Sequence, residues 1–328
     1  MLDPFGRAVS YLRVSVTDRC NYRCNYCMTE DMVFLPRREL LTLEELERIA
    51  GVFIDLGVSK LRITGGEPLV RRDILSLFRA LGGRLGDGLE ELTLTSNGTL
   101  LQRYAAALAG CGVRRINISL DTLHPRRFRA LTRNGEHADV MAGIEAAKAA
   151  GLQVKINTVA LRGVNDDEFN DLVDWCGKHG FDLTFIESMP MGDIGQLRDS
   201  HFLSLREVQE QIARHWTLKA SDYTSGGPSR YWDVAESGQR IGFITPYSHN
   251  FCESCNRVRL TCTGTLYLCL GQDDSCDLRT PLRDGAGDAE LKQIIVDAIA
   301  RKPRGHDFDE TRLADGAQVV RFMNTTGG

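Results

Sequence analysis

The chain has 328 residues, and 40 Lys plus Arg against 44 Asp plus Glu give a formal net charge of −4. A slightly acidic protein has no general attraction to nucleic acid or to an anionic membrane surface, so neither is expected as a partner. Residues 1–10 lack the basic start and apolar run of a signal peptide, and the most apolar stretch, 104–113, has about half the length of a membrane span. These features predict a soluble, cytoplasmic protein.

Short aliphatic runs alternate with longer amphipathic ones between residue 10 and about residue 188. The aliphatic runs predict strands over 11–16, 60–64, 91–95, 114–120, 153–161 and 182–187. Between them, Thr42 and Glu45 form a capping-box pattern, and 165–168 resembles an N-cap with an acidic first turn. Such β-α repeats predict a parallel sheet covered by helices, either doubly wound or closed into a partial barrel.

Residues with unusual chemistry lie at or near the carboxyl ends of the predicted strands. They are Cys20, Gly65–Pro68, Thr95, Ser119, Asn157 and Met189. Barrel enzymes build their active sites on this face, whereas a doubly wound sheet would concentrate a ligand at one switch point. We therefore expect a partial (β/α)6 barrel over residues 1–188.

The regular alternation stops after residue 188. The remaining residues, 189–328, predict a C-terminal region that closes the barrel. It contains a helix capped by Ser204, short strands over 241–270 with a turn at 263–265, and a helix over 288–300.

Ten cysteines are a high number for this length, and six of them form two spaced motifs. Clustering in a chain without an export signal favours metal or redox use over a disulfide framework. The other four are Cys111, Cys176, Cys262 and Cys276. The first two of these are expected to be buried in helices.

The first motif is C-x3-C-x2-C, formed by Cys20, Cys24 and Cys27 directly after the first predicted strand. A [4Fe–4S] cluster normally takes four cysteines, so three thiolates leave one iron open for chemistry. A structural zinc site needs four ligands, yet no further Cys or His follows until Cys111. An aromatic residue, Tyr26, precedes the last ligand. The motif resembles the radical S-adenosylmethionine (SAM) enzymes, in which SAM occupies the open iron.

The second motif is C-x2-C-x13-C, formed by Cys252, Cys255 and Cys269. Cys262 and Cys276 are alternatives for a third or fourth ligand, and a zinc ribbon closed by one of them is the competing interpretation. Within 256–259, two arginines stand two positions apart on an extended segment, so they point to the same side. Arginines beside a charged metal site favour an anionic ligand there.

Together these segments resemble the GTP 3′,8-cyclase family, the radical SAM enzymes that open molybdenum cofactor biosynthesis. The resemblance rests on 12–20, 62–68, 155–159, 185–187, the second motif with Asn256-Arg257-Val258-Arg259, and the Gly327-Gly328 tail. It covers essentially the whole chain. It implies one [4Fe–4S] cluster on each cysteine motif, and the open iron of the second cluster is expected to meet the guanine base.

The resemblance also assigns residues to two small molecules. SAM contacts are implied for Tyr26, Gly65, Gly66, Glu67, Pro68, Ser119 and Met189. GTP contacts are implied for Arg13, Arg62, Thr95, Lys155, Arg257 and Arg259, with Lys60 a weaker candidate. GTP carries about four negative charges, and cations in a barrel interior need such an anionic partner. The terminal Gly-Gly is expected to reach into the site beside Arg13.

In the implied reaction a 5′-deoxyadenosyl radical abstracts the ribose C3′ hydrogen of GTP. The C3′ radical then attacks C8 and gives 3′,8-cyclo-7,8-dihydro-GTP. The implied partners are a reductant such as flavodoxin or ferredoxin and, downstream, cyclic pyranopterin monophosphate synthase. The oligomeric state stays open, with a homodimer among the alternatives.

The chain departs from the family at Thr184, where an Arg often precedes the Phe-Ile-Glu stretch. If that Arg contacts the triphosphate, this chain binds it with fewer charges or with a substitute such as Arg162 or Arg198. A radical SAM peptide-modifying maturase with an auxiliary cluster is the alternative function. A non-catalytic zinc-binding interaction module is a third interpretation, but it leaves the strand-end residues and Lys155 unexplained.

Overall fold

The computed structural model describes residues 1–193, 200–247, 251–309, 311–312 and 317–327. Their strands form one sheet in the order β12-β11-β10-β1-β2-β3-β4-β5-β6-β9-β8-β7. The strands are β1 Tyr11–Ser15, β2 Lys60–Thr64, β3 Glu91–Ser96, β4 Arg115–Ser119, β5 Gln153–Ala160, β6 Asp182–Glu187, β7 Leu218–Ala220, β8 Arg230–Val234, β9 Arg240–Ile244, β10 Arg257–Leu260, β11 Thr265–Tyr267 and β12 Ser275–Asp277.

The central part of the sheet is parallel. Strand β10 pairs in parallel with β1, β1 to β6 follow in chain order, and β9 pairs in parallel with β6. At each end an antiparallel extension completes the sheet, β11 and β12 at one end and β8 and β7 at the other. The two end strands, β12 and β7, do not pair with each other in the described chain. The sheet is therefore open, which confirms the predicted partial barrel.

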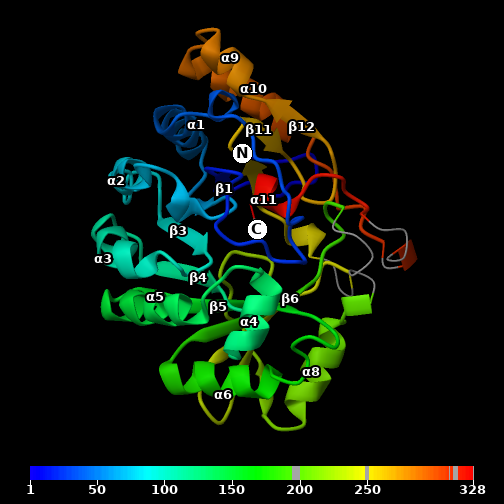
Figure 1. Cartoon of the computed structure of the whole chain (residues 1–328). Coiled ribbons are helices and arrows are strands. Elements are labelled where there is room, and N and C mark those ends of the chain that lie inside the picture. The colour runs from blue at the N-terminus through cyan, green and yellow to red at the C-terminus, as the bar shows by residue number, and fades with distance from the viewer. Residues whose placement is uncertain (194–199, 248–250, 310, 313–316, 328) are drawn as a thin grey trace.

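Helices cover the outer face of the sheet. The described helices are α1 Leu43–Asp55, α2 Ile74–Gly82, α3 Leu101–Gly110, α4 Pro125–Thr132, α5 His137–Ala149, α6 Phe169–His179, α8 Leu205–Ala213, α9 Arg279–Arg283, α10 Asp288–Ile299 and α11 Met323–Thr326, of which α11 does not belong to the outer layer. Figure 1 shows α1, α2, α3, α5 and α6 as an arc around the strands, while α11 lies inside that arc. The C-terminal segment therefore enters the barrel.

Strands β1 to β5 have an apolar outer face and a mostly polar inner face, because successive side chains of a strand alternate. In β1, Leu12 and Val14 belong to the buried core that includes the α1 residues Leu46 and Phe53. The alternate residues of β1 and β2 point inward and include Arg13. The aliphatic residues that predicted the strands thus hold the helices, and the residues between them build the interior.

The predicted elements agree with the structure in most places. Thr42 and Glu45 form the expected capping box at α1, and the Ser204 side chain caps α8 by accepting from the Arg206 amide. The helix expected to open at 165–168 is an exception, because α6 begins at Phe169. The Asn165 side chain is buried and accepts from the Leu161 amide at 2.9 Å, so it fixes the preceding loop and does not cap the helix.

Two further predictions concern a membrane-spanning segment and the domain boundary at residue 188. Among the described residues, no helix is both long enough and apolar enough to cross a bilayer. The boundary at residue 188 stays a prediction. The sheet itself runs across that boundary, since β9 and β10 extend it at both ends.

Candidate functional site

One large cavity occupies the inside of the barrel. It is lined by most of the residues singled out in the sequence, namely Arg13, Cys20, Cys24, Tyr26, Cys27, Lys60, Arg62, Gly65, Gly66, Thr95, Ser119, Lys155, Met189, Cys252, Cys255, Arg257, Arg259 and Cys269. Glu67 and Pro68 are absent from this lining. The fold therefore brings both cysteine motifs and the predicted cations to one space.

The first cysteine motif lies in the loop that leaves the carboxyl end of β1. Its backbone is fixed against the end of α4, where the Asn25 amide donates to the Leu131 carbonyl at 3.0 Å. Burial raises the pKa of Cys20 to about 11 and that of Cys27 to about 12, and it raises the pKa of Cys24 well above its usual value. Three half-buried thiols that line one cavity fit a cationic metal group, which stabilises thiolates that burial alone disfavours.

Tyr26 links this loop to the neighbouring strands. Its hydroxyl donates to the Asp121 carboxylate at 2.6 Å, and the same carboxylate accepts from the Val159 amide at 2.8 Å. Burial raises the pKa of Asp121 to about 6. The Tyr26 hydroxyl is therefore bound to Asp121, at the ends of β4 and β5, and its ring remains part of the cavity wall next to Cys27.

The glycines after β2 allow two loops to pack backbone to backbone. The Gly66 amide donates to the Thr17 carbonyl at 2.8 Å, in the loop that leads to Cys20. A Cβ on Gly65 would lie 2.7 Å from the Thr17 carbonyl oxygen, and one on Gly66 would lie 2.3 Å from that of Arg19. Only glycine permits this close approach.

We expect Gly66→Ala to impair assembly of the first metal site, because its Cβ would push away the loop that carries Cys20. Iron and labile sulfide per chain, measured after anaerobic reconstitution, should fall by about half, since half of the predicted iron sits on this motif. Gly110→Ala is the matched control, because its added Cβ meets no atom within 4 Å. Full iron content in the Gly66 variant would contradict this role.

Glu67 supports the site from beneath the cavity wall. Its buried carboxylate accepts from the Leu69 amide at 3.0 Å, the Ser96 hydroxyl at 3.0 Å and the Asn97 amide at 2.6 Å. The Asn97 side chain in turn lies 3.8 Å from the Cys20 sulfur. The SAM contact implied for Glu67 stays a prediction. In this structure Glu67 positions Asn97 beside the first motif, and Pro68 begins the short turn behind it.

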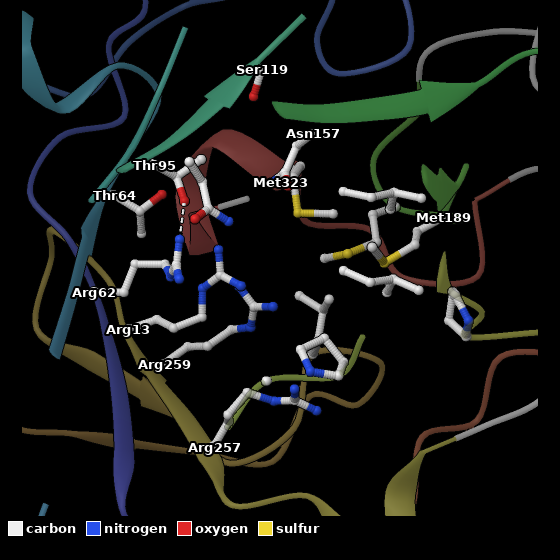
Figure 2. Close-up of a pocket in the computed structure, with 18 of the residues that line it drawn as sticks. Arg13, Arg62, Thr64, Thr95, Ser119, Asn157, Met189, Arg257, Arg259 and Met323 are labelled. Atoms are coloured by element: carbon white, nitrogen blue, oxygen red, sulfur yellow. Dashed lines mark hydrogen bonds between the residues drawn. The ribbon is translucent and has the colours of Figure 1, made fainter. Parts of the chain in front are cut away.

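Two rows of side chains cross the parallel strands at matched register. Arg62 of β2, Arg13 of β1 and Arg259 of β10 form one row. Lys60, Tyr11 and Arg257 form a second row, two residues earlier on the same strands. Figure 2 shows the guanidinium groups of the first row converging, with Arg62 donating to the Thr95 hydroxyl at 3.1 Å.

Burial disfavours the charged form of several cations of this wall. Burial lowers the pKa of Arg13 to about 10, and burial together with the neighbouring arginines lowers that of Arg259 well below its usual value. Burial also lowers the pKa of Lys155, a residue of β5. Grouped cations that are this poorly solvated predict a polyanionic ligand.

Two tyrosines, which the sequence analysis did not single out, accompany these cations. Tyr11 accepts from the Arg62 guanidinium, and Tyr231 of β8 accepts from the Lys155 ammonium at 2.5 Å. Burial acts to raise the pKa of Tyr11, but Arg62, Arg13 and Lys60 outweigh it and bring the pKa to about 7. Only the position of Tyr11, two residues before Arg13 on the inner face of β1, hinted at this role.

The second cysteine motif lies at the opposite end of the strands. Cys255 stands two residues before β10, which runs parallel to β1, whereas the first motif follows the end of β1. Arg257 and Lys302 both approach the Cys255 sulfur, at 3.6 and 3.8 Å. Burial acts to raise the pKa of Cys255, but these two cations outweigh it and lower the pKa to about 7.

The lining of the cavity favours one of the alternative donor sets for the second motif, which stays a prediction. Cys252, Cys255 and Cys269 line it, whereas the alternatives Cys262 and Cys276 do not. The set of three fits a cluster with one open iron, as at the first motif.

Lys302 was missed by the sequence analysis, since it lies in a loop 47 residues from Cys255. Of the two cysteines expected in helices, Cys176 is buried within α6, and Cys111 is only half-buried at the end of α3.

The remaining polar and tail residues occupy other parts of the wall. Ser119 and Met189 both line the cavity, and Figure 2 shows Ser119 across the cavity from the arginines. The Gly327 carbonyl accepts from Arg259, so the tail enters the site as far as it is described. Gly328 lies outside the described residues, and so does Arg198.

The other predicted substitute for a charge at Thr184 is not available to the cavity. Arg162 pairs with Glu207 at 2.9 Å, and both side chains are about half exposed on the surface. The structure thus offers no substitute charge from Arg162.

Known proteins share both the sequence and the fold. Residues 14–176 match the Radical SAM superfamily, and residues 181–308 match Molybdenum Cofactor Synthesis C. A protein of Paracoccus denitrificans named GTP 3′,8-cyclase is 59% identical over 100% of this chain and 96% of its own length. A GTP 3′,8-cyclase of Rhizobium etli is 58% identical over 100% of this chain and 94% of its own.

Solved structures agree on the fold. The crystal structure of Streptococcus suis SuiB matches with a TM-score of 0.63 and 16% identity, covering 97% of this chain and 77% of that one. At this identity the likeness concerns the fold alone.

Proposed function

Because the chain belongs to the GTP 3′,8-cyclase family of radical SAM enzymes, we propose that it converts GTP into 3′,8-cyclo-7,8-dihydro-GTP, the first step of molybdenum cofactor biosynthesis. One observation carries the proposal. A single cavity joins two triads of cysteines at opposite ends of the strands, with rows of buried cations on the strands between them. A nucleoside triphosphate supplies both the anionic groups and the base that this arrangement calls for.

The two cysteine triads would hold two [4Fe–4S] clusters, Cys20, Cys24 and Cys27 the first and Cys252, Cys255 and Cys269 the second. When bound, the reduced first cluster and SAM supply a 5′-deoxyadenosyl radical, which removes the ribose C3′ hydrogen before C3′ bonds to C8. Tyr26, Gly65, Gly66, Ser119 and Met189 are the proposed SAM contacts. Arg13, Arg62, Thr95, Lys155, Arg257 and Arg259 are the proposed GTP contacts.

The chain's own residues would mainly position the nucleotide and exclude water. The cation rows fix the triphosphate along the strands, which orients the ribose toward the first triad and the base toward the second. Arg257 touches both the Cys255 sulfur and the cavity, so it would connect the substrate to the second triad. Such positioning would limit the reaction to one part of the substrate.

The competing function, a peptide-modifying maturase, has less support. A peptide carries no concentrated negative charge that would offset six buried or half-buried cations in one cavity. The likeness to SuiB rests on the fold at 16% identity and does not extend to its substrate.

We also propose an electron donor, a downstream enzyme and a cellular location for the protein. We expect a low-potential one-electron donor such as flavodoxin or ferredoxin, and transfer of the product to cyclic pyranopterin monophosphate synthase. A cytoplasmic location would keep the ten cysteines reduced. A homodimer stays a prediction.

The direct test is anaerobic turnover of reconstituted protein with SAM, dithionite and either GTP or ATP. Mass analysis should find 5′-deoxyadenosine and a cyclised nucleotide with GTP and not with ATP. Cleavage of SAM while GTP survives unchanged would remove the cyclase assignment and leave the fold and the first triad in place.

A further inference from the structure

The loop between β7 and β8 closes the cavity at the amino ends of the strands. It starts from one edge of the open sheet, yet the Ser225 carbonyl accepts from Lys60 of β2 at 2.6 Å. The Gly226 carbonyl accepts from Asn256, directly before β10, at 3.4 Å. Since β8 and β10 lie in opposite halves of the strand order, this loop spans the opening that the sheet leaves.

The loop places hydroxyl groups among the cations. Ser225, Gly227 and Ser229 all line the cavity. The Tyr231 hydroxyl donates to the Ser225 hydroxyl at 2.9 Å and accepts from Lys155 at 2.5 Å. A chain of polar contacts therefore connects the loop to a buried lysine on the far strand β5.

Ser229 has a buried hydroxyl that no described protein group satisfies. The residue is 8% exposed, and its Oγ has no hydrogen-bond partner among the described residues. This Oγ lies 2.1 Å from the point where a Cβ on Gly242 would stand, so the glycine leaves room for it. Burying a hydroxyl without a partner is unfavourable, which indicates that a ligand completes it.

The position of the β7–β8 loop indicates which part of the nucleotide it contacts. Lys60 is the first residue of β2, and the loop touches it, whereas the first cysteine triad lies past the opposite, carboxyl end of β1. With the ribose at the first triad, both the base and the triphosphate extend toward the amino ends of the strands. The loop is assigned to the triphosphate because it is connected to Lys155 through the Tyr231 hydroxyl. Hydroxyl donors next to fixed ammonium groups are well suited to phosphate oxygens.

We infer that Ser225 and Ser229 form the subsite for the terminal phosphate of the nucleoside triphosphate, with Lys155 as its counter-charge. Lys60 is paired with Glu91 at 2.6 Å and holds the loop through the Ser225 carbonyl. The inference rests on the proposed function and deepens it. The loop then also explains a site with Thr184 in place of an arginine, because neutral donors from the β7–β8 loop reach the cavity beside that position. Thr184 and Ser229 both approach the point above Gly242, the former at 2.8 Å.

The test compares the affinities of GTP, GDP and GMP by anaerobic calorimetry on reconstituted protein. Ser229→Ala should weaken GTP binding by about tenfold, the effect of one hydrogen bond to a charged group, and should leave GMP binding unchanged. Ser225→Ala, an independent variant, should show the same selective loss. Thr224→Ala is the control, because this exposed neighbour bonds only within the loop and does not line the cavity.

The outcomes separate the subsite from the function. A loss of GMP affinity equal to that of GTP, or an equal loss in the Thr224 variant, would overturn the subsite. So would unchanged GTP affinity in both serine variants. Failure of the unaltered protein to bind GTP at all would instead overturn the proposed function. Iron content and melting temperature of each variant confirm that it is folded.

Discussion

Replacing Cys24 with Ala is expected to abolish the formation of 5′-deoxyadenosine from SAM. The first motif offers three cysteines for its metal group, and all three line the cavity. Loss of one leaves two thiols for a group that normally takes four ligands, so the cluster should not be retained. Reconstituted protein should lose about half of its iron, and mass analysis should find no 5′-deoxyadenosine.

The control for this experiment is Cys111→Ala. Cys111 is half-buried at the end of α3 and does not line the cavity, so its loss should change neither iron content nor SAM cleavage. Undiminished 5′-deoxyadenosine from the Cys24 variant would show that the radical is generated elsewhere.

Replacing Lys155 with Met is expected to weaken GTP binding while it stabilises the protein without substrate. Lys155 is 4% exposed, and burial disfavours its charged form. Met has a similar volume and no charge, and such exchanges of buried charges are often stabilising. The Tyr231 hydroxyl keeps its bond to Ser225 at 2.9 Å, so no new buried polar group loses its partner. A gain of about 1 °C or more in melting temperature is expected.

The loss of affinity should be large, because removing one partner of a buried, hydrogen-bonded charge pair typically costs about 2 kcal/mol or more, roughly 30-fold. Calorimetry with GTP measures it. Lys219→Met, on the exposed face of β7, is the control and should change neither quantity. Equal affinity for GTP in the Lys155 variant would contradict its place in the substrate site. A loss of affinity together with a lower melting temperature would indicate a structural role.

Local patterns in the sequence predicted the parts of the fold that depend on neighbouring residues. The inner strands follow from aliphatic runs, and the start of α1 follows from Thr42 and Glu45. The cation rows follow from the same rule, since Arg257 and Arg259 alternate on a strand and so must share a face. The sequence therefore predicted much of the cavity wall before any pairing was known.

Features that depend on distant pairing could not be predicted in this way. The parallel pairing of β10 with β1 joins Tyr11 to a residue 246 positions away, and nothing in either segment alone specifies it. Tyr231 reaches Lys155 across 76 positions for the same reason. The hydrogen bonds of the Glu67 carboxylate to Ser96 and Asn97, about 30 positions away, likewise depend on the pairing of β2 with β3 and were not predicted.

The central claim is that hydrogen abstraction from the ribose of GTP begins the cyclisation. Its most direct test is anaerobic turnover of reconstituted protein with SAM, a reductant and GTP deuterated at C3′. The account predicts one deuterium in the 5′-deoxyadenosine and none at C3′ of the cyclised product. 5′-Deoxyadenosine without deuterium, beside GTP that keeps its label, would contradict it.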